Sequence, residues 1–200
     1  MCQKQAGSRF GFNVGLNMNL LILGIIIFFS IHLVPIFPLK NILINRLGEN
    51  KYKGLYSSIA LVGLLIIIYG FGRADLHPVW DPLPYSREIA LALMPISMIL
   101  LAAANIQTNI KKFIKHPMLI SILIWSFVHL IANADLRSII LFGSFGLYAL
   151  IDIFFSKKVL TTNIEVKYTL SKDIMVIIIG LVAYLIIVYY HQFIAGVTIF

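Results

Sequence analysis

Charged residues are scarce in this chain of 200 residues. Asp, Glu, Lys and Arg make up 12% of the sequence, whereas hydrophobic residues make up 60%. Soluble domains typically contain about 25% charged residues, because their surfaces face water. The scarcity of charge therefore excludes an ordinary soluble domain and predicts an integral membrane protein.

Cysteine is almost absent, and so are the short motifs that mark many enzymes. The one cysteine, Cys2, excludes an internal disulfide, a thiolate cluster and the covalent attachment of c-type haem. The sequence contains no Walker A, G-x-G-x-x-G, H-E-x-x-H or G-x-S-x-G motif. Nucleotide-binding, zinc-protease and serine-hydrolase functions therefore lack their usual residues. Any bound metal needs ligands other than cysteine.

Six apolar runs follow one another along the chain. They cover residues 19–37, 55–72, 89–104, 117–134, 138–155 and 174–190. A helix needs roughly 20 residues to cross a hydrocarbon core about 30 Å thick, so each run is a minimal span. None alternates between apolar and polar residues as the strands of a membrane barrel do. The predicted fold class is all-α, an integral membrane bundle of about six transmembrane helices.

Basic residues outnumber acidic ones by 16 to 8, and they lie mostly between the apolar runs. No basic patch with interleaved aromatic residues occurs, so we expect membrane lipid as a partner and no nucleic acid. Eleven basic residues fall on one side of the predicted membrane and five on the other. The eleven are Lys40, Arg46, Lys51, Lys53, Lys111, Lys112, Lys115, Lys157, Lys158, Lys167 and Lys172, and the five are Lys4, Arg9, Arg73, Arg87 and Arg137. The positive-inside rule then predicts that both termini lie on the non-cytoplasmic side.

Two histidines lie inside apolar runs, His32 in the first and His129 in the fourth. An unpaired imidazole inside the membrane costs several kcal/mol, so both need partners. Either each one hydrogen-bonds a Ser, an Asn or a carbonyl of a neighbouring helix, or both ligate a metal or clamp a b-type haem. Each lies about 5 Å from the middle of its span, on opposite sides, which permits a shared haem without requiring it.

The surroundings of His129 contain further polar and aromatic residues at helical spacing. Trp125 and Asn133 lie four residues before and after it, and Ser126 lies three before it, so all three share its face. This face either lines a cofactor pocket or serves ordinary helix packing, with Trp125 and Asn133 as interface and capping residues.

Basic residues and further histidines lie at the ends of the runs. Arg73, Arg137 and Lys115 are placed to neutralise the propionates of a haem by charge-assisted hydrogen bonds, or they act only as topology determinants. His116 and His77 each precede a proline at a helix boundary, where a cap or turn role competes with ligation.

Seven segments, in order between about residues 19 and 158, resemble the NnrU family of bacterial membrane proteins. They are IHLVP at 31–35, LGENKYKGL at 47–55, GFGR at 70–73, PVW at 78–80, KHPM at 115–118, WSFVHLIANADL at 125–136 and LFGSF at 141–145. The resemblance implies residence in the bacterial inner membrane. The family is named for an association with nitric oxide and nitrite reduction in denitrifiers.

The NnrU family is related to the plastid 15-cis-zeta-carotene isomerase, a haem b enzyme. The two axial histidines of that enzyme lie in motifs similar to those around His32 and His129, so the resemblance implies that these two residues ligate the iron of a haem b. His116 corresponds to another His-Pro of the relative. The sequences differ directly after the first histidine, where the isomerase has Ser-Gly and this chain has Leu33 and Val34.

These features predict an inner-membrane, bis-histidine haem b protein that supports nitrogen-oxide or respiratory redox metabolism. Its further partners would be nitric oxide or a lipid-soluble substrate, and a redox partner that the sequence does not identify. The alternative is a haem-dependent isomerase of a polyene or other membrane lipid. A methyltransferase of the isoprenylcysteine type is a weaker match, because Lys115 departs from its Arg-His-Pro and no paired acidic residues follow. A structural membrane subunit without a cofactor is the fourth hypothesis. No catalytic residue is assigned.

The chain is divided into three parts by these patterns. Residues 1–18 are predicted to be a disordered extension, or to result from a start codon chosen upstream of the true one. Residues 19–158 form the NnrU-like membrane domain. Residues 159–200 contain a loop and an additional C-terminal transmembrane helix.

Overall fold

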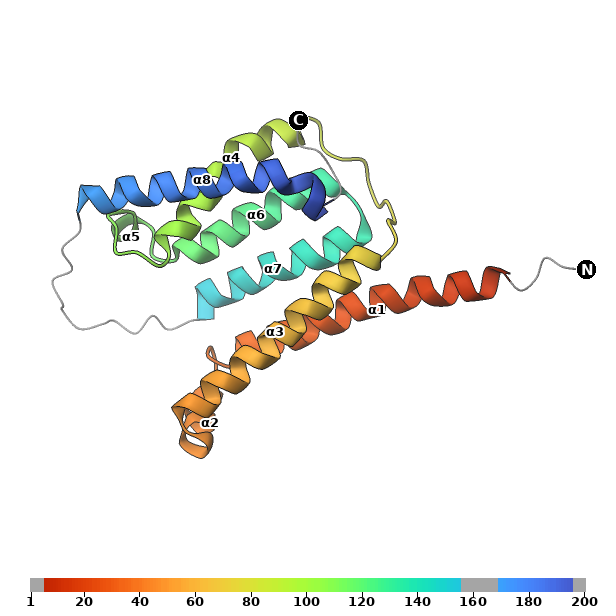
Figure 1. Cartoon of the computed structure of the whole chain (residues 1–200), viewed down its shortest axis with the longest axis horizontal. Helices are drawn as coiled ribbons and strands as arrows, with labels where there is room; N and C mark the ends of the chain where they lie inside the picture. Colours follow the sequence, from red (N-terminus) through yellow and green to blue (C-terminus); the bar gives the residue numbers. More distant parts are fainter. Residues whose placement is uncertain (1–5, 156–168, 196–200) are drawn as a thin grey trace, which may run out of the picture. The chain divides into compact units, whose positions relative to one another are not determined.

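The computed structural model describes residues 6–155 and 169–195, and these residues form helices and no β-strand (Figure 1). This confirms the predicted all-α class. The helices are α1 (Ala6–Leu33), α2 (Leu39–Leu47), α3 (Glu49–Arg73), α4 (Ser86–Ala103), α5 (Ile110–Phe113), α6 (Pro117–Asn133), α7 (Leu136–Phe155) and α8 (Leu170–Ala195).

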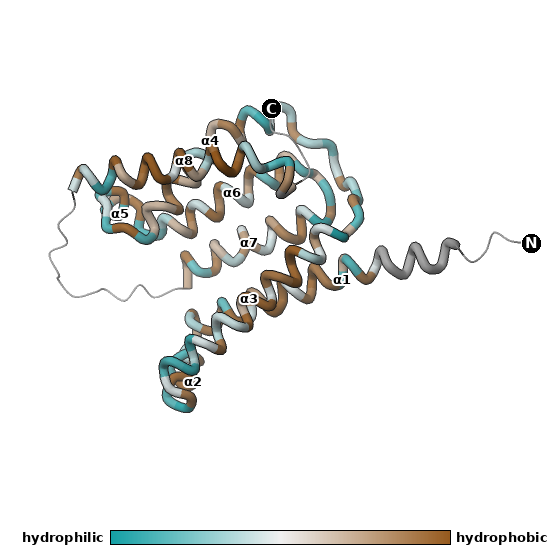
Figure 2. The backbone as a smooth tube through the Cα atoms, viewed as in Figure 1, coloured by the Kyte–Doolittle hydropathy of each residue, from teal (hydrophilic) through white to brown (hydrophobic). Residues whose placement is uncertain are grey.

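Five of these helices are long and apolar enough to cross a membrane. The candidate spans are Gly15–Leu33, Glu49–Arg73, Ser86–Ala103, Leu136–Phe155 and Leu170–Phe193, and α6 is a shorter apolar helix of 17 residues. At 1.5 Å per residue α6 is about 25 Å long, close to the thickness of the hydrocarbon core. Figure 2 shows hydrophobic colour along most of α3, α4 and α8. Each predicted run thus corresponds to one observed helix.

The first helix differs from its prediction at both ends. It begins at Ala6 and ends at Leu33, whereas the apolar run predicted residues 19–37. Residues 6–18, predicted to be a disordered extension, continue the helix, because no proline interrupts this stretch. Pro35 and Pro38 follow the last turn and prevent the helix from reaching residue 37. The predicted loop at residues 159–168 lies outside the described residues.

One compact unit contains α1, α2, α3 and the first turns of α7. Helices α1 and α3 lie side by side (Figure 1), and glycines allow their backbones to approach closely. A Cβ atom added to Gly24 would lie 2.7 Å from the Ile67 nitrogen, and one added to Gly63 would lie 2.8 Å from the Phe28 nitrogen. Only glycine permits this spacing.

The other compact unit contains α4, α5, α6, the rest of α7 and α8. Helix α4 packs against both α6 and α8. Between α4 and α6 the buried Ser97 hydroxyl donates to the Ser121 carbonyl (2.9 Å), and the Ser121 hydroxyl donates to the Ser97 carbonyl (2.8 Å). Gly180 of α8 lies against the Ile99 backbone, where an added Cβ would be 2.6 Å from the Ile99 Cα. Small and hydroxyl-bearing residues therefore define both contacts of α4.

Candidate functional site

His32 lies in the last turn of α1, within an aromatic cluster of the first unit. Its Nδ1 is 2.7 Å from the carbonyl oxygen of Phe28, one turn earlier. The imidazole stacks on the Phe28 ring, with centroids 4.0 Å apart, and its centroid is 5.5 Å from that of Tyr56 on α3. Tyr52, buried one turn from Tyr56, extends this cluster with a centroid distance of 6.1 Å. One aromatic ring of α1 and one of α3 thus lie next to the His32 imidazole.

His129 has the same local arrangement in the second unit. Its Nδ1 is 2.8 Å from the carbonyl oxygen of Trp125, and the two rings have centroids 5.2 Å apart. Trp125 in turn meets Phe145 of α7 edge to face at 5.5 Å. The buried Ser126 lies close to Gly146, where an added Cβ would be 3.4 Å from the Ser126 Cβ. The predicted proximity of His129 and Trp125 is therefore present.

In each histidine, the hydrogen bond to the carbonyl oxygen one turn earlier determines which ring nitrogen carries the proton. A carbonyl oxygen only accepts hydrogen bonds, so Nδ1 must be the protonated, donating nitrogen in both His32 and His129. In a neutral imidazole the lone pair then resides on Nε2. Metal-ligating histidines commonly donate their other ring N–H to a carbonyl or carboxylate, which fixes the tautomer and the ring orientation. The donor chemistry of both residues therefore fits ligation through Nε2.

Asn133, predicted to share the face of His129, lies at the end of α6. It directly precedes Ala134, which closes the helix in the left-handed conformation with a φ of 51°. Asn133 therefore lies at the boundary of the helix, one turn beyond His129. Its role as a cofactor-binding residue stays a prediction.

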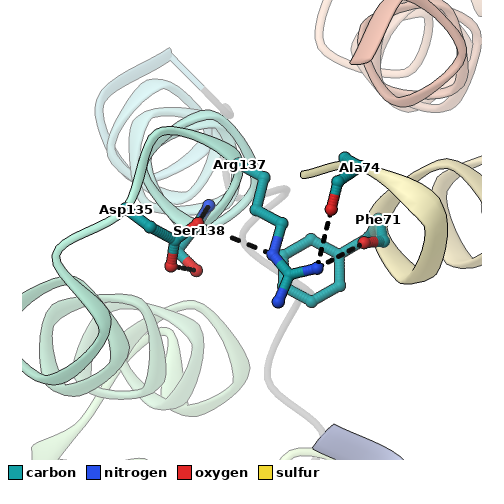
Figure 3. Close-up of polar contacts among 5 residues, drawn as sticks. All are labelled: Phe71, Ala74, Asp135, Arg137 and Ser138. Carbon is teal, nitrogen blue, oxygen red and sulfur yellow. Dashed lines mark hydrogen bonds and ion pairs between the residues drawn. The ribbon is translucent and has the colours of Figure 1, made fainter. Parts of the chain in front are cut away.

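Arg137 stabilises the C-terminal end of α3 (Figure 3). Its Nη1 donates to the carbonyl oxygens of Ala74 (2.9 Å) and Phe71 (3.2 Å), and its guanidinium lies 4.8 Å from the centroid of the Phe71 ring. The Asp135 carboxylate forms an ion pair with the Arg137 Nε at 3.6 Å. It also accepts hydrogen bonds from the Ser138 hydroxyl (2.6 Å) and from the Ser138 backbone N–H (3.1 Å). Arg137 was expected to bind a propionate, and no sequence motif indicates that it donates to backbone carbonyls.

The other basic candidates lie at exposed positions. Arg73, the last residue of α3, is exposed and lies 5.2 Å from the centroid of the Tyr69 ring. Lys115, in the segment before α6, is exposed as well. Both lie at helix ends, as predicted, and the binding of propionates by either residue stays a prediction.

His116 lines a cleft in the second unit. It precedes Pro117 at the start of α6, and its carbonyl oxygen accepts from the Ile120 N–H at 3.0 Å. The cleft has a volume of about 290 Å³, and Asn105 and Asp152 also line it. The Tyr148 hydroxyl donates to Asp152 at 3.4 Å. Asn105 and Asp152 were not expected beside His116, because they lie in separate segments and form no spaced motif.

These observations define the class of the protein, an all-α protein with several membrane-spanning helices and a histidine in each of two apolar helices. The family model described as NnrU protein matches residues 20–199, so the chain belongs to the NnrU family. The matched region includes α8, although none of the seven resembling segments lies in that helix. No curated protein and no solved structure matches the chain.

Proposed function

We propose that this NnrU family protein is a haem b protein of the bacterial inner membrane, with His32 and His129 as the two axial ligands. The observation that carries the proposal is the identical local bonding of the two histidines. Each donates Nδ1–H to the carbonyl oxygen one turn earlier, and each therefore presents Nε2 as the ligating nitrogen. Two histidines on different membrane helices need no cysteine to hold a haem.

In this proposal the residues around the two histidines orient the imidazole rings, exclude water and bind a propionate. The carbonyls of Phe28 and Trp125 restrain the imidazole rings and raise the basicity of Nε2. The rings of Phe28, Tyr56 and Trp125 exclude water from the ligating nitrogens. Arg73, exposed at the end of α3, is the better candidate for a propionate, because Nη1 of Arg137 already donates to two carbonyls.

Haem b supplies one-electron redox chemistry when it is bound. Ligation by the imidazoles of both His32 and His129 would suit the group to electron transfer. The protein would therefore support nitrogen-oxide or respiratory redox metabolism by passing electrons to or from a redox partner. Nitric oxide or a lipid-soluble substrate would be a further partner of the protein.

The test is a titration of detergent-purified apoprotein with haemin. We expect saturable uptake of one haem per chain, and loss of that uptake in His32→Gly and in His129→Gly. Added imidazole should restore binding in both variants, because it occupies the space of the missing ring and supplies the same ligand. If imidazole restores haemin binding, the variant has lost a ligand and not its fold.

The matched control is His77→Ala. The His77 side chain is exposed, and its backbone carbonyl accepts a hydrogen bond from the Leu136 N–H, which the substitution leaves in place. This variant should take up haemin like the wild type. Equal uptake by all four proteins, or no uptake by the wild type, would overturn the assignment of the ligands.

A further inference from the structure

Helix α2 is too short to cross a membrane and is not enclosed by the protein. It has 9 residues, none of them buried, and is therefore about 14 Å long, less than half the thickness of the hydrocarbon core. It packs mainly against α3 among the helices described, with Leu43 and Ile44 as half-buried residues. A helix this short and this exposed suits the membrane surface better than the membrane interior.

The backbone fixes α2 in this position. Gly48 separates α2 from α3 with a φ of 83°, and its N–H bonds to the Ile44 carbonyl while its carbonyl accepts from Tyr52. A single residue thus closes one helix and opens the next. This conformation is accessible to glycine and strained for other residues.

Apolar side chains remain exposed on and beside α2. Phe37 is 53% exposed, Leu39 is 49% exposed and Ile42 is 48% exposed. In Figure 2 hydrophobic and hydrophilic colours alternate along α2. Water is an unfavourable environment for three such neighbours, whereas the boundary between headgroups and acyl chains is favourable.

Positive charge accompanies these apolar residues. Between residues 34 and 60 the basic residues are Lys40, Arg46, Lys51 and Lys53, and the one acidic residue is Glu49. Glu49 pairs with Lys53 at 2.7 Å and also interacts electrostatically with Lys40, so this segment retains a net positive charge from Lys40, Arg46 and Lys51. All three are exposed. The apolar side chains match the acyl chains of an anionic phospholipid, and the cationic side chains match its negatively charged headgroup.

We propose that α2, with the first turn of α3, is a binding site for anionic phospholipid. Lys40, Arg46 and Lys51 contact the phosphate headgroups, while Phe37, Leu39 and Ile42 insert at the level of the first acyl carbons. The site is independent of haem, because none of these residues belongs to the proposed ligand set.

The test is native mass spectrometry of the purified full chain, titrated with phosphatidylglycerol or with phosphatidylcholine. We expect the wild type to retain phosphatidylglycerol about tenfold better than phosphatidylcholine, because basic residues near a headgroup attract its negative charge. Lys40→Gln, Arg46→Gln and Lys51→Gln, combined in one variant, should abolish the preference. The matched control replaces Lys111, Lys112 and Lys115 by Gln, which removes the same charge elsewhere.

A second variant tests the apolar half of the site. Leu39→Asn combined with Ile42→Asn should weaken retention of phosphatidylglycerol several-fold while leaving the helical circular dichroism unchanged, because both side chains are exposed. The proposal is overturned if the two charge variants lose the preference equally, if neither loses it, or if the apolar variant retains lipid like the wild type.

Discussion

At the scale of single residues, the pair of Asp135 and Arg137 is expected to stabilise the protein strongly. Arg137→Ala would leave the buried Asp135 carboxylate without its cation, and the carbonyl oxygens of Phe71 and Ala74 at the end of α3 without this donor. We predict a loss of about 3 kcal/mol in the free energy of unfolding. Reversible unfolding in mixed micelles, followed by circular dichroism, measures this loss.

Two further variants make the arginine test specific. Arg137→Lys keeps the charge but lacks the planar guanidinium, so it should recover only part of the loss. Arg73→Ala removes an exposed arginine and should change the free energy of unfolding by no more than about 0.5 kcal/mol. Equal effects of the Arg73 and Arg137 substitutions would contradict the structural role of Arg137.

The sequence predicts some of these residues much better than others. An imidazole inside an apolar run must have a partner, so His32 and His129 are conspicuous from the order of residues alone. The role of Arg137 cannot be predicted in this way, because its acceptors are backbone carbonyls that any residue possesses. The pair of Ser97 and Ser121 is equally hard to predict, since single hydroxyls are common in apolar helices.

At the scale of helices, the contact between α1 and α3 depends on Gly70. A Cβ atom added there would lie 2.5 Å from the Leu21 nitrogen, whereas one added to Gly72 of the same helix would meet nothing within 4 Å. We predict that Gly70→Ala lowers the free energy of unfolding by about 2 kcal/mol through overpacking. Gly72→Ala should leave it unchanged or raise it by up to about 1 kcal/mol. The same unfolding assay measures both variants. Equal changes in the free energy of unfolding for Gly70→Ala and Gly72→Ala would contradict the close contact of α1 and α3 at Gly70.

The contact between α4 and α6 makes a different prediction, which concerns additivity. Each serine hydroxyl donates to a backbone carbonyl that substitution of the other serine leaves in place. Ser97→Ala and Ser121→Ala should each cost about 0.6 kcal/mol. Because the two hydroxyl oxygens also lie 3.0 Å apart, within hydrogen-bond distance, the cost of the double variant should differ from their sum by at least about 0.5 kcal/mol.

The control for this pair is Ser126→Ala. The buried Ser126 hydroxyl has no hydrogen-bond partner among the described residues, so its removal should cost almost nothing. A coupling energy near zero between Ser97 and Ser121 would contradict the contact between the two hydroxyls.

Hydrophobicity predicts the helices of this chain more reliably than their ends. It indicates which residues prefer lipid, and all six apolar runs correspond to helices. It does not indicate where hydrogen bonding stops, so it does not predict the start of α1 at Ala6. The short helices α2 and α5 lie between the predicted runs, because Lys40 and Arg46 in one and Lys111 and Lys112 in the other interrupt the apolar pattern.

At the scale of the whole molecule, the unequal distribution of basic residues predicts the orientation. With an even number of spans, both termini should lie outside the cytoplasm. Alkaline phosphatase fused after Phe200 should therefore be active in a bacterial host, because this enzyme matures only outside the cytoplasm. A fusion after Lys115 should be inactive. The reverse pattern would contradict the predicted orientation.

The central claim is that His32 and His129 ligate one haem b, and the most direct measurement is a reduced-minus-oxidised visible spectrum. It should be recorded on protein purified from haem-supplied cells, with His32→Ala and His129→Ala prepared in parallel. We predict a sharp b-type α-band in the wild type that both substitutions abolish. A colourless wild type, or a spectrum that neither substitution alters, would contradict the claim.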